Sequence, residues 1–365
     1  MLTKAITKTI LDEVKTAMEA YLNEEQGMQS FLERTQNIHS IEKLPGDAST
    51  RRYYRISTLD QRTREVRSLI MMAMDSFSDK GGEIPFLTIQ RHLAGAGVDV
   101  PAVLDFDAKQ GFILLEDLGD TTLLRSLQEV SDRNQERACF EKAIDGLVVL
   151  HTATGPDFAT PDEKRLIEGF KLRFDVEKLM WEVNFTFEHF YEKHLQRTIK
   201  PADQEVMNAG FLRICTELAN EPVVFTHRDF HSRNLMVTDS GRYVMIDFQD
   251  ARMGPCQYDL ASLLRDSYYQ LDEAQIQHLA RYYLDQMAAR GRVIRDEARF
   301  MRMFDLMAVQ RNFKAIGSFA SFLNRRGNPG YLKFIGNTFE NIRRNLLKYP
   351  EFARLREVLY HYYYF

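Results

Sequence analysis

This chain has few cysteines, no long apolar run and little net charge, and each of these features excludes a class of protein. The three cysteines, Cys139, Cys215 and Cys256, are odd in number, widely separated and without the spacing of metal ligands, which favours reduced thiols over disulfides or a zinc site. The longest apolar run, residues 69–74, is bounded by charge and is far shorter than the ~18 residues of a membrane span. We therefore expect a cytoplasmic protein with no membrane segment.

An export signal and an excess of one charge are also missing. Lys4 and Lys8 lie near the N-terminus, but Asp12, Glu13 and Lys15 interrupt the segment where a signal peptide needs a continuous apolar core. A formal net charge of -4 over 365 residues gives no electrostatic reason to expect nucleic acid or an anionic membrane as partner. A small molecule is the partner that we expect.

The chain has enough apolar material for a substantial core, since 44% of its residues are hydrophobic and 12% are aromatic. This length is compatible with one large or two ordinary domains. Residues 1–37 are expected to contain a leading amphipathic helix. Residues 38–118 show the pattern of a small sheet with one helix, at residues 86–94. The expected strands cover residues 38–43, 53–57, 66–74, 103–106 and 112–116.

From residue 119 to residue 365 the apolar residues recur at helical spacing, interrupted by one hairpin. The expected helices cover residues 134–152, 163–195, 203–219, 257–270, 273–290, 296–323 and 331–347. Residues 360–365 are unusually aromatic, which indicates either a tail packed on this lobe or a partner-binding segment. The sequence predicts an α+β fold in which a small sheet lobe precedes a larger, mostly helical lobe.

Two segments carry the chemistry. The segment from His227 to Asn234 reads HRDFHSRN, which matches the catalytic-loop pattern H-R-D-x-x-x-x-N of kinases. In that pattern the aspartate, here Asp229, holds the hydroxyl group that is phosphorylated, and the asparagine binds a metal ion. Further along the chain, Asp247 supplies a second metal-binding oxygen group. The alternative is that both aspartates are ordinary turn and strand-end residues.

The spacing of these segments has a physical reason. Residues 235–237 and 243–246 are apolar and β-prone, and the residues between them favour a tight reversal. Antiparallel pairing of the two runs would bring Asn234 and Asp247 to the same edge of a hairpin. Mg²⁺ prefers oxygen ligands with only one or two carboxylates, leaving positions for water and phosphate. We therefore predict an enzyme that uses ATP and Mg²⁺, with Asn234 and Asp247 as the metal ligands.

A loop between the first two expected strands, residues 45–54, could cover the nucleotide phosphates. Its small residues would let backbone N–H groups approach phosphate oxygens, Ser49 and Thr50 could donate hydrogen bonds, and Arg51 or Arg52 could neutralise charge. With one glycine, the loop has fewer than a glycine-rich phosphate loop normally contains. An ordinary hairpin turn explains the segment equally well.

Taken together these motifs resemble the aminoglycoside-phosphotransferase-like kinases. Within that family they are similar to a bacterial branch containing the anomeric N-acetylmuramate/N-acetylglucosamine kinases of cell-wall recycling. The resemblance implies a protein-kinase-like fold of two lobes, and it covers nearly the whole chain after residue 40. The segments that carry it are residues 46–53, 227–234, 247–251, 254–255, 258–260, 263–266 and 306–311, with Lys314 and Gly317.

Carried over residue by residue, the resemblance implies a role for several side chains. Asp229 would be the catalytic base, and Asn234 and Asp247 the Mg²⁺ ligands. Asp259 would support the catalytic loop from a neighbouring helix, and His227 would support it from within. Backbone groups of residues 116–118, from Glu116 to Leu118, would bind the adenine of ATP.

The chain departs from the usual kinase pattern on its third strand. Kinases place a lysine there, paired with a glutamate on the following helix, to hold the nucleotide phosphates. Residues 69–75 contain no lysine, and Glu83 is the only nearby candidate for the glutamate. Arg51 and Arg52, or Lys80, would have to supply the missing charge. If no cation does so, the protein would be a nucleotide-binding pseudokinase.

The residues that select the acceptor are harder to identify. Glu182 lies with Trp181 on a helix that the resemblance places beside the acceptor pocket. Asp266 and Arg311 are further candidates, and an arginine could hold the lactyl carboxylate of N-acetylmuramate. For each of the three the alternative is structural: a solvated helix face with a buried Trp181, or a buried ion pair that joins two helices.

Three functions therefore remain open. The first is an anomeric amino-sugar kinase, and the second is a kinase of the same fold that acts on an aminoglycoside or an amino alcohol. Residues 291–345 are rich in arginine and lysine, which argues against a polycationic acceptor. The third is the non-catalytic nucleotide-binding protein. The sequence does not indicate the oligomeric state.

Overall fold

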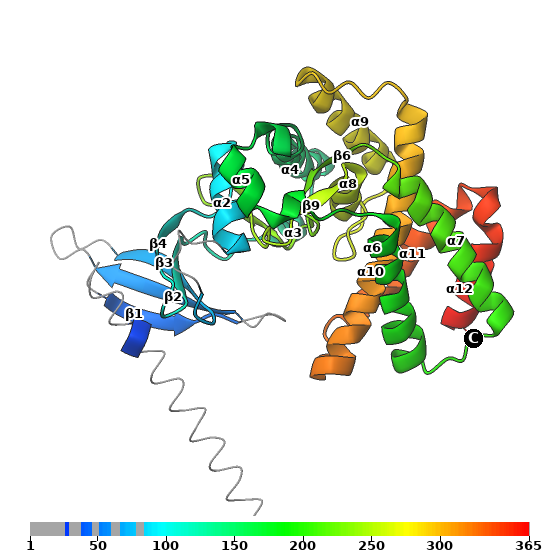
Figure 1. Ribbon diagram of the computed structural model, residues 1–365, viewed down its shortest axis with the longest axis horizontal. Helices are drawn as coiled ribbons and strands as arrows, with labels where there is room; N and C mark the ends of the chain where they lie inside the picture. The colour runs from blue at the N-terminus through cyan, green and yellow to red at the C-terminus, as the bar shows by residue number, and fades with distance from the viewer. Residues whose placement is uncertain (1–25, 29–37, 46–50, 60–65, 78–83, 365) are drawn as a thin grey trace, which may run out of the picture. The chain divides into compact units, whose positions relative to one another are not determined.

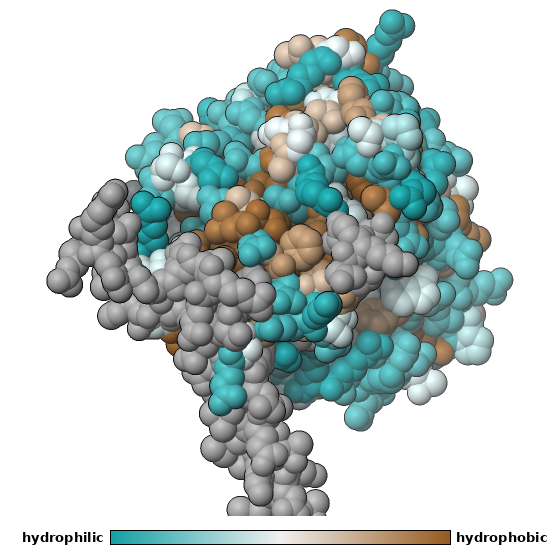
Figure 2. Space-filling view, turned by 60° about the vertical axis from the view of Figure 1, so that its left-hand side comes forward, coloured by the Kyte–Doolittle hydropathy of each residue, from teal (hydrophilic) through white to brown (hydrophobic). Residues whose placement is uncertain are grey.

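The computed structural model describes residues 26–28, 38–45, 51–59, 66–77 and 84–364. Their contacts divide the chain into two compact units, Met1–Ile84 with Pro101–Asp117 and Pro85–Val100 with Leu118–Phe365. Most of the expected leading helix and the loop residues Ser49 and Thr50 lie outside the described residues. On the face drawn in Figure 2 hydrophilic residues predominate, and the hydrophobic ones gather in a limited area. No helix of the described residues is both long enough and apolar enough to cross a bilayer.

The first unit contains an antiparallel sheet of five strands in the order β1-β2-β3-β5-β4 (Figure 1). Alternate residues of β2, β3 and β5 point to the same face, as the period of two requires. The buried residues of that face are Tyr54, Ile56, Met71, Ala73, Phe112 and Leu114, joined by Met28. All five strands were predicted. Their bounds are Ile38–Lys43, Arg52–Leu59, Val66–Ala73, Val103–Asp107 and Phe112–Glu116.

The second unit is mostly helical, as predicted. It begins with α2 (Pro85–Gly95), whose Phe86 stacks on Phe248 with ring centroids 5.1 Å apart. The long helix α10 (Glu297–Arg326) is buried around much of its circumference and contacts α6, α7, α8 and α11. The other α-helices are α3 (Leu123–Glu129), α4 (Arg133–Ala153), α5 (Pro161–Leu166), α6 (Val176–Thr186), α7 (Pro201–Ala219), α8 (Gln257–Leu264), α9 (Glu273–Ala289), α11 (Ile335–Leu347) and α12 (Ala353–Tyr364).

Two short strand pairs lie within this helical unit. The pair β7 (Leu235–Val237) and β8 (Tyr243–Met245) is the predicted hairpin, and Gly241 in its turn has φ +77°, a conformation that favours glycine. The pair β6 (Val223–Thr226) and β9 (Arg252–Pro255) was not predicted. Each strand of this second pair has only four residues, and the two are far apart in the sequence. Local patterns therefore could not show that they pair.

The prediction of one helix over residues 163–195 was wrong. The structure has α5, then a short 3₁₀ turn, then α6, which continues into the π-helix η3 (Phe187–His194). Gly169 lies in the 3₁₀ turn, where an added Cβ would collide with the backbone oxygen of Ala251, and Asp175 caps a new helix by accepting from Lys178 N–H at 2.7 Å. Helix α8 also ends at Leu264, earlier than the predicted residue 270. The aromatic residues 360–364 of the expected tail form the end of helix α12.

The three cysteines are free, as predicted. Burial raises the pKa of the Cys215 and Cys256 thiols to about 12. Both therefore stay protonated and unreactive near neutral pH.

Candidate active site

The catalytic loop runs from His227 to Asn234, between β6 and β7, and a buried carboxylate holds its first turn. Asp259 of α8 accepts hydrogen bonds from the backbone N–H groups of His227, at 2.7 Å, and Arg228, at 2.9 Å. Arg228 has φ +79°, a conformation that costs free energy in a residue other than glycine. The two bonds from Asp259 offset that cost. This is the supporting position that the resemblance implied for Asp259.

The support extends to a second layer of buried side chains. Nε2 of His151 lies 3.1 Å from Asp259, and its Nδ1 lies 2.8 Å from the hydroxyl oxygen of Tyr283. His151 comes from α4 and Tyr283 from α9, so three helices fix the start of the loop. The sequence analysis did not identify His151, because a lone histidine on a helix gives no signal of its partners.

Asp266 holds the middle of the same loop. One oxygen of its carboxylate accepts from Ser232 N–H at 3.0 Å and from Ser232 Oγ at 2.5 Å, and the other accepts from Tyr268 N–H at 2.9 Å. Burial raises the pKa of Asp266, and the bonds from Ser232 partly oppose that rise. Asp266 was a candidate acceptor-binding residue, but its contacts in the structure are to the protein itself.

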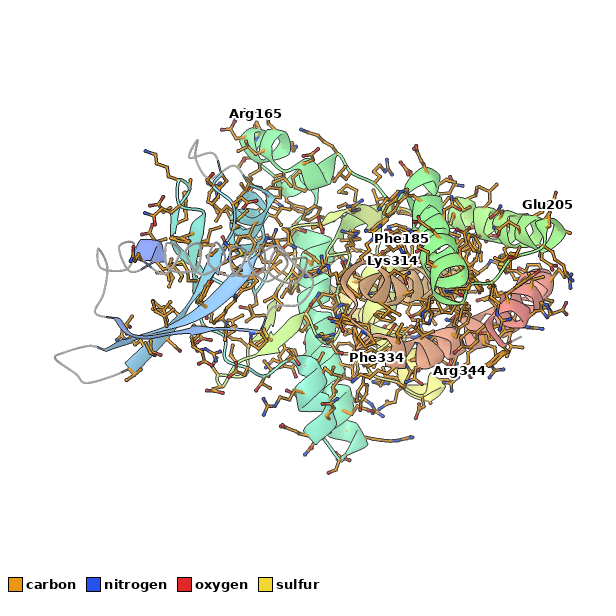
Figure 3. All side chains as sticks on the ribbon, turned by 90° about the horizontal axis from the view of Figure 1, so that it is seen from below. Arg165, Phe185, Glu205, Lys314, Phe334 and Arg344 are labelled. Atoms are coloured by element: carbon orange, nitrogen blue, oxygen red, sulfur yellow. The ribbon has the colours of Figure 1, made fainter. Side chains whose placement is uncertain are left out.

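Asp229 lies in the loop with its side chain 26% exposed, and Nζ of Lys314 is 3.1 Å from its Oδ1. Burial raises the pKa of Asp229. The positive charges of Lys314, Arg228 and Arg311 lower it by more, so the pKa is well below its usual range. The carboxylate is therefore ionised and able to accept a hydrogen bond from a hydroxyl group. In Figure 3, Lys314 lies on α10, among elements that include α6 with Phe185 and the 3₁₀ turn with Phe334.

Asn234 and Asp247 lie at the same edge of the hairpin, as the predicted pairing required. Ile246 N–H donates to the backbone oxygen of Asn234 at 3.0 Å. Asp247 therefore directly follows the residue that is bonded to Asn234. Nδ2 of Asn234 donates to the backbone oxygen of Asp229 at 3.0 Å. This bond fixes the orientation of the amide, and the side-chain oxygen of Asn234 is the atom that can bind a cation. Asp247 is exposed, has φ +66° and accepts from Gln249 at 2.7 Å.

This donor set fits Mg²⁺. The described residues contain no group of three or more His, Cys, Asp or Glu side chains that could enclose a metal ion. One amide oxygen and one carboxylate leave most of an octahedral shell for water and phosphate, which is how Mg²⁺ binds with a nucleotide. The site is thus suited to a metal that arrives with its substrate.

Glu182 of α6 is buried, at 1% exposure, and is held on two sides. One of its carboxylate oxygens accepts from Nε2 of Gln310 at 3.1 Å, and the other lies 3.5 Å from Nζ of Lys178. Lys178 also lies 4.0 Å from the centroid of the Trp181 ring. Trp181 is 55% exposed, so the alternative in which it belongs to the core is wrong. Glu182 joins α6 to α10 beside the catalytic loop.

Arg311 of α10 is 5% exposed, and among the described residues it has no side-chain hydrogen bond and no ion pair. Its charge nevertheless acts on the catalytic loop. Burial and Arg311 lower the pKa of His231 to about 3, so this histidine is neutral. A buried cation without a carboxylate partner is costly. Such a group is expected where a ligand brings the opposite charge.

Of the residues predicted to bind the nucleotide, Arg51, Arg52 and Glu116 belong to the first unit and Leu118 belongs to the second. Arg52 is the first residue of β2 and is paired with Ala73 in the ladder, and Arg51 precedes it. Glu116 ends β5, and its side chain accepts from Ala102 N–H at 3.2 Å. Ser49, Thr50, Lys80 and Glu83 lie outside the described residues.

The structure adds an ion pair that the sequence analysis missed in the first unit. Arg55 of β2 donates two hydrogen bonds to Asp117, at 2.7 and 3.1 Å, so the carboxylate is bound in a bidentate manner. Asp117 is the residue between Glu116 and Leu118. The pair therefore anchors the segment that the resemblance assigns to adenine binding. Sequence separation hid it, since Arg55 and Asp117 are 62 residues apart.

The chain is similar in sequence to known phosphotransferases. A family model described as "Phosphotransferase enzyme family" matches residues 40–294. The chain is 33% identical over 314 residues to an N-acetylmuramate/N-acetylglucosamine kinase of Neisseria meningitidis, covering 86% of this chain and 87% of that protein. It is 32% identical over 318 residues to the protein of the same name from Pseudomonas aeruginosa, covering 86% of each chain.

Among solved structures, the fold is similar to that of choline kinase LicA from Streptococcus pneumoniae. The TM-score is 0.57 at 14% sequence identity, and the match covers 88% of this chain and 99% of LicA. At that identity the similarity concerns the fold alone. It confirms the protein-kinase-like architecture that the sequence predicted.

Proposed function

The chain belongs to the phosphotransferase enzyme family, and from that premise we propose that it phosphorylates the anomeric hydroxyl of an amino sugar, N-acetylmuramate or N-acetylglucosamine. The observation that carries the proposal is the ionised Asp229 in a braced HRD loop, beside the oxygen groups of Asn234 and Asp247. The acceptor follows from relatives of that name at 33% and 32% identity. The product would serve cell-wall recycling in the cytoplasm.

Asp229 would act on the acceptor rather than on the nucleotide. Its carboxylate accepts a hydrogen bond from the acceptor hydroxyl and aligns the oxygen with the γ-phosphoryl group of ATP. The bond between the γ-phosphorus and the β,γ-bridging oxygen breaks while the bond to the acceptor oxygen forms, and the hydroxyl proton passes to Asp229. A weak base suffices, because an anomeric hydroxyl is more acidic than an ordinary alcohol.

Asn234 and Asp247 would hold Mg²⁺ through their side-chain oxygens. When bound, the ion supplies positive charge for the β- and γ-phosphoryl oxygens. The protein's own contribution is to fix both ligands on one hairpin edge, so that they meet the nucleotide without rearrangement. Asp259 and His227 support the loop in this proposal and take no part in the reaction.

The nucleotide would bind to residues 38–118. We assign the phosphate contacts to the loop residues Ser49 and Thr50 with Arg51 and Arg52, and the adenine contacts to backbone groups from Glu116 to Leu118. The ion pair between Arg55 and Asp117 supports the second assignment, because it limits motion of that segment. Residues 38–118 would thus be the nucleotide-binding lobe and residues 119–365 the catalytic and acceptor-binding lobe.

Arg311 and Glu182 are the acceptor-binding residues in this proposal. N-acetylmuramate differs from N-acetylglucosamine by a lactyl group that carries a carboxylate, and Arg311 is a buried guanidinium without an ion pair among the described residues. The lactyl carboxylate would form an ion pair with this guanidinium. Glu182 has one oxygen bonded to Gln310 and would accept from a sugar hydroxyl. Asp266 is retained only as a support of the loop.

A cationic acceptor is less favoured. Choline kinase LicA shares the fold, so an amino alcohol or an aminoglycoside is the competing substrate class. Around Asp229, however, lie Lys314, Arg228 and Arg311, whose combined charge lowers the pKa of the carboxylate. Positive groups at this position would repel a cationic substrate. The same groups suit a neutral or anionic sugar.

The test is release of ADP from Mg·ATP in the presence of N-acetylmuramate, N-acetylglucosamine, glucose or kanamycin. Phosphorus NMR would locate the new phosphate. We expect turnover with the amino sugars and phosphate on the anomeric carbon. Asp229→Ala should lower kcat by roughly 10²–10⁴, the usual contribution of a positioned general base.

The matched control is Asp239→Ala, which removes an exposed carboxylate from the turn of the β7–β8 hairpin. It should leave kcat unchanged. Turnover with kanamycin alone would reject the amino-sugar assignment, and nucleotide binding without turnover of any acceptor would favour a pseudokinase.

A further inference from the structure

The lysine that kinases carry on their third strand is absent from β3, but the structure has another lysine beside the catalytic aspartate. Nζ of Lys314 lies 3.1 Å from Oδ1 of Asp229, at the place where the acceptor oxygen must bind. Lys314 belongs to α10, whereas the match to the family model ends at residue 294. The residue therefore reaches the reaction centre from a helix that lies beyond the matched family segment.

The backbone around Lys314 is held rigidly. Thr186 of α6 donates from Oγ1 to the backbone oxygen of Phe313 at 2.8 Å. A Cβ added to Gly317 would lie 2.7 Å from Cα of Thr186, so α10 and α6 are in direct backbone contact one turn further along. Phe313 itself packs against Phe211, with ring centroids 4.4 Å apart. Lys314 is thus delivered to the site with little freedom at its Cα.

The two arginines within the loop have other partners. Arg228 forms an ion pair with Asp250 at 2.9 Å. The guanidinium carbon of Arg233 lies 5.0 Å from the ring of Tyr268, in cation–π contact. Lys314 differs from both, because its partner is the carboxylate that the acceptor must use. When an acceptor binds to Asp229, the ammonium group of Lys314 must pair with another anion.

We propose that Lys314 is a catalytic residue that neutralises the γ-phosphoryl group during transfer. In the resting protein the ammonium group pairs with Asp229. The acceptor hydroxyl then takes the place of Nζ beside Oδ1, and Nζ moves to a γ-phosphoryl oxygen. The ammonium keeps its proton throughout, so the proton of the hydroxyl still goes to Asp229.

The required movement is small. In a near-attack geometry the acceptor oxygen is roughly 3 Å from the γ-phosphorus, and it is a hydrogen-bond length from Asp229. Because the acceptor oxygen would occupy the present position of Nζ beside Oδ1, a γ-phosphoryl oxygen would lie within about 5 Å of that position. The four-carbon stem of lysine covers such a displacement by changing rotamers. The side chain is 16% exposed, which leaves its end free to turn.

This inference rests on the proposed phosphoryl transfer but not on the identity of the acceptor. It is tested by measuring the binding of ADP and of the non-hydrolysable analogue AMP-PNP, both with Mg²⁺, by titration calorimetry without acceptor. Lys314→Met should weaken AMP-PNP by about tenfold, since it loses a charge-assisted contact. The affinity for ADP, which has no γ-phosphate, should not change.

Turnover gives the second measurement. Removing one preorganised donor to the transition state typically lowers kcat by about 10²–10³, and Lys314→Met should do so. Lys314→Arg, which keeps the charge, should restore kcat to within about tenfold of the parent, because its longer side chain can still reach the phosphoryl oxygens. The control Lys164→Met removes an exposed lysine from α5 and should alter neither affinity nor kcat.

Equal effects of Lys314→Met on ADP and AMP-PNP, or no effect on either, would overturn the proposal. Lys314 would then only position Asp229. Thermal unfolding of each variant shows whether it is folded, and Lys314→Gln provides a second neutral variant if Lys314→Met is not. Because the binding measurement needs no acceptor, failure of the amino-sugar assignment would leave this test intact.

Discussion

At the scale of single residues, charge is the property that the site controls. Lys314, Arg228 and Arg311 together keep Asp229 ionised although burial opposes ionisation. His231, two residues further along the loop, is kept neutral by burial and by Arg311. The loop thus presents one negative group surrounded by positive ones. That pattern suits a reaction in which an anionic phosphoryl group approaches a carboxylate.

Arg311 provides a prediction at this scale. Arg311→Met should lower kcat/KM for N-acetylmuramate by about 10–100-fold, because hydrogen bonds to a charged group contribute roughly 1.5–3 kcal/mol. The value for N-acetylglucosamine, which has no carboxylate, should change by less than about threefold on the same reasoning. The two acceptors are measured in parallel, with the exposed Arg295→Met as control.

Stability separates this role from a structural one. If Arg311 serves the ligand, removing an unpaired buried cation should leave the unfolding midpoint unchanged or raise it. Equal losses with both sugars together with a lower midpoint would show that Arg311 holds the fold instead.

At the scale of elements, α10 organises the second unit. It contacts α6, α7, α8 and α11, and it carries Gln310, Arg311 and Lys314 within five consecutive positions. Its N-cap, Asp296, accepts from Arg299 N–H, and Gly327 with φ +65° ends it. A single helix therefore carries both Arg311, which we propose to bind the acceptor, and Lys314, which lies beside Asp229. Its position against α6 should matter for both stability and activity.

Gly317→Ala tests this position. The new Cβ would overlap Thr186, whose Cα is 2.7 Å away, so α10 and α6 must move apart. Overpacking of this kind typically costs about 1–3 kcal/mol. We expect a lower unfolding midpoint in urea and, because Lys314 would shift, a lower kcat.

The control is Gly336→Ala in α11. At that position an added Cβ would meet no atom closer than 3.9 Å, and alanine in a helix is favoured over glycine by about 1 kcal/mol. Stability should therefore be unchanged or slightly higher. An unfolding midpoint of Gly317→Ala equal to that of the parent protein would contradict the close packing.

At the scale of the whole molecule, the site described here is complete only with its substrates. In the proposed site Asn234 and Asp247 would offer Mg²⁺ one amide oxygen and one carboxylate, and the described residues contain no group of three His, Cys, Asp or Glu side chains that could hold a metal ion. The nucleotide must supply further oxygens. Metal and nucleotide should therefore stabilise the protein together and much less when separate.

This linkage is measurable by thermal unfolding. Mg·AMP-PNP at 100 times its Kd should add about 2.7 kcal/mol to the free energy of unfolding, and EDTA should remove most of the corresponding rise in Tm. Asp247→Asn should reproduce the effect of EDTA in the presence of Mg²⁺. Asp239→Asn, an exposed change nearby in sequence, should not. A rise in Tm that EDTA leaves intact would contradict metal binding by Asn234 and Asp247.

The sequence alone was sufficient for the parts of this protein that local patterns encode. Short β-prone runs predicted all five strands of the sheet, and the hairpin that brings Asn234 and Asp247 together followed from two apolar runs and a glycine turn. The HRD loop and its resemblance to a known family pointed to phosphoryl transfer. In each case neighbouring residues carry the information, because strand period and turn geometry are local properties.

Only the tertiary structure decided how distant residues meet. Lys314 lies 85 positions from Asp229, and its ion pair cannot be inferred from either segment. The pairing of β6 with β9 and the support of the loop by His151 have the same origin, since each joins segments whose contact depends on helix packing. A lysine on a helix can face solvent or a carboxylate equally well. The packing of α10 against α6 determines which it does here.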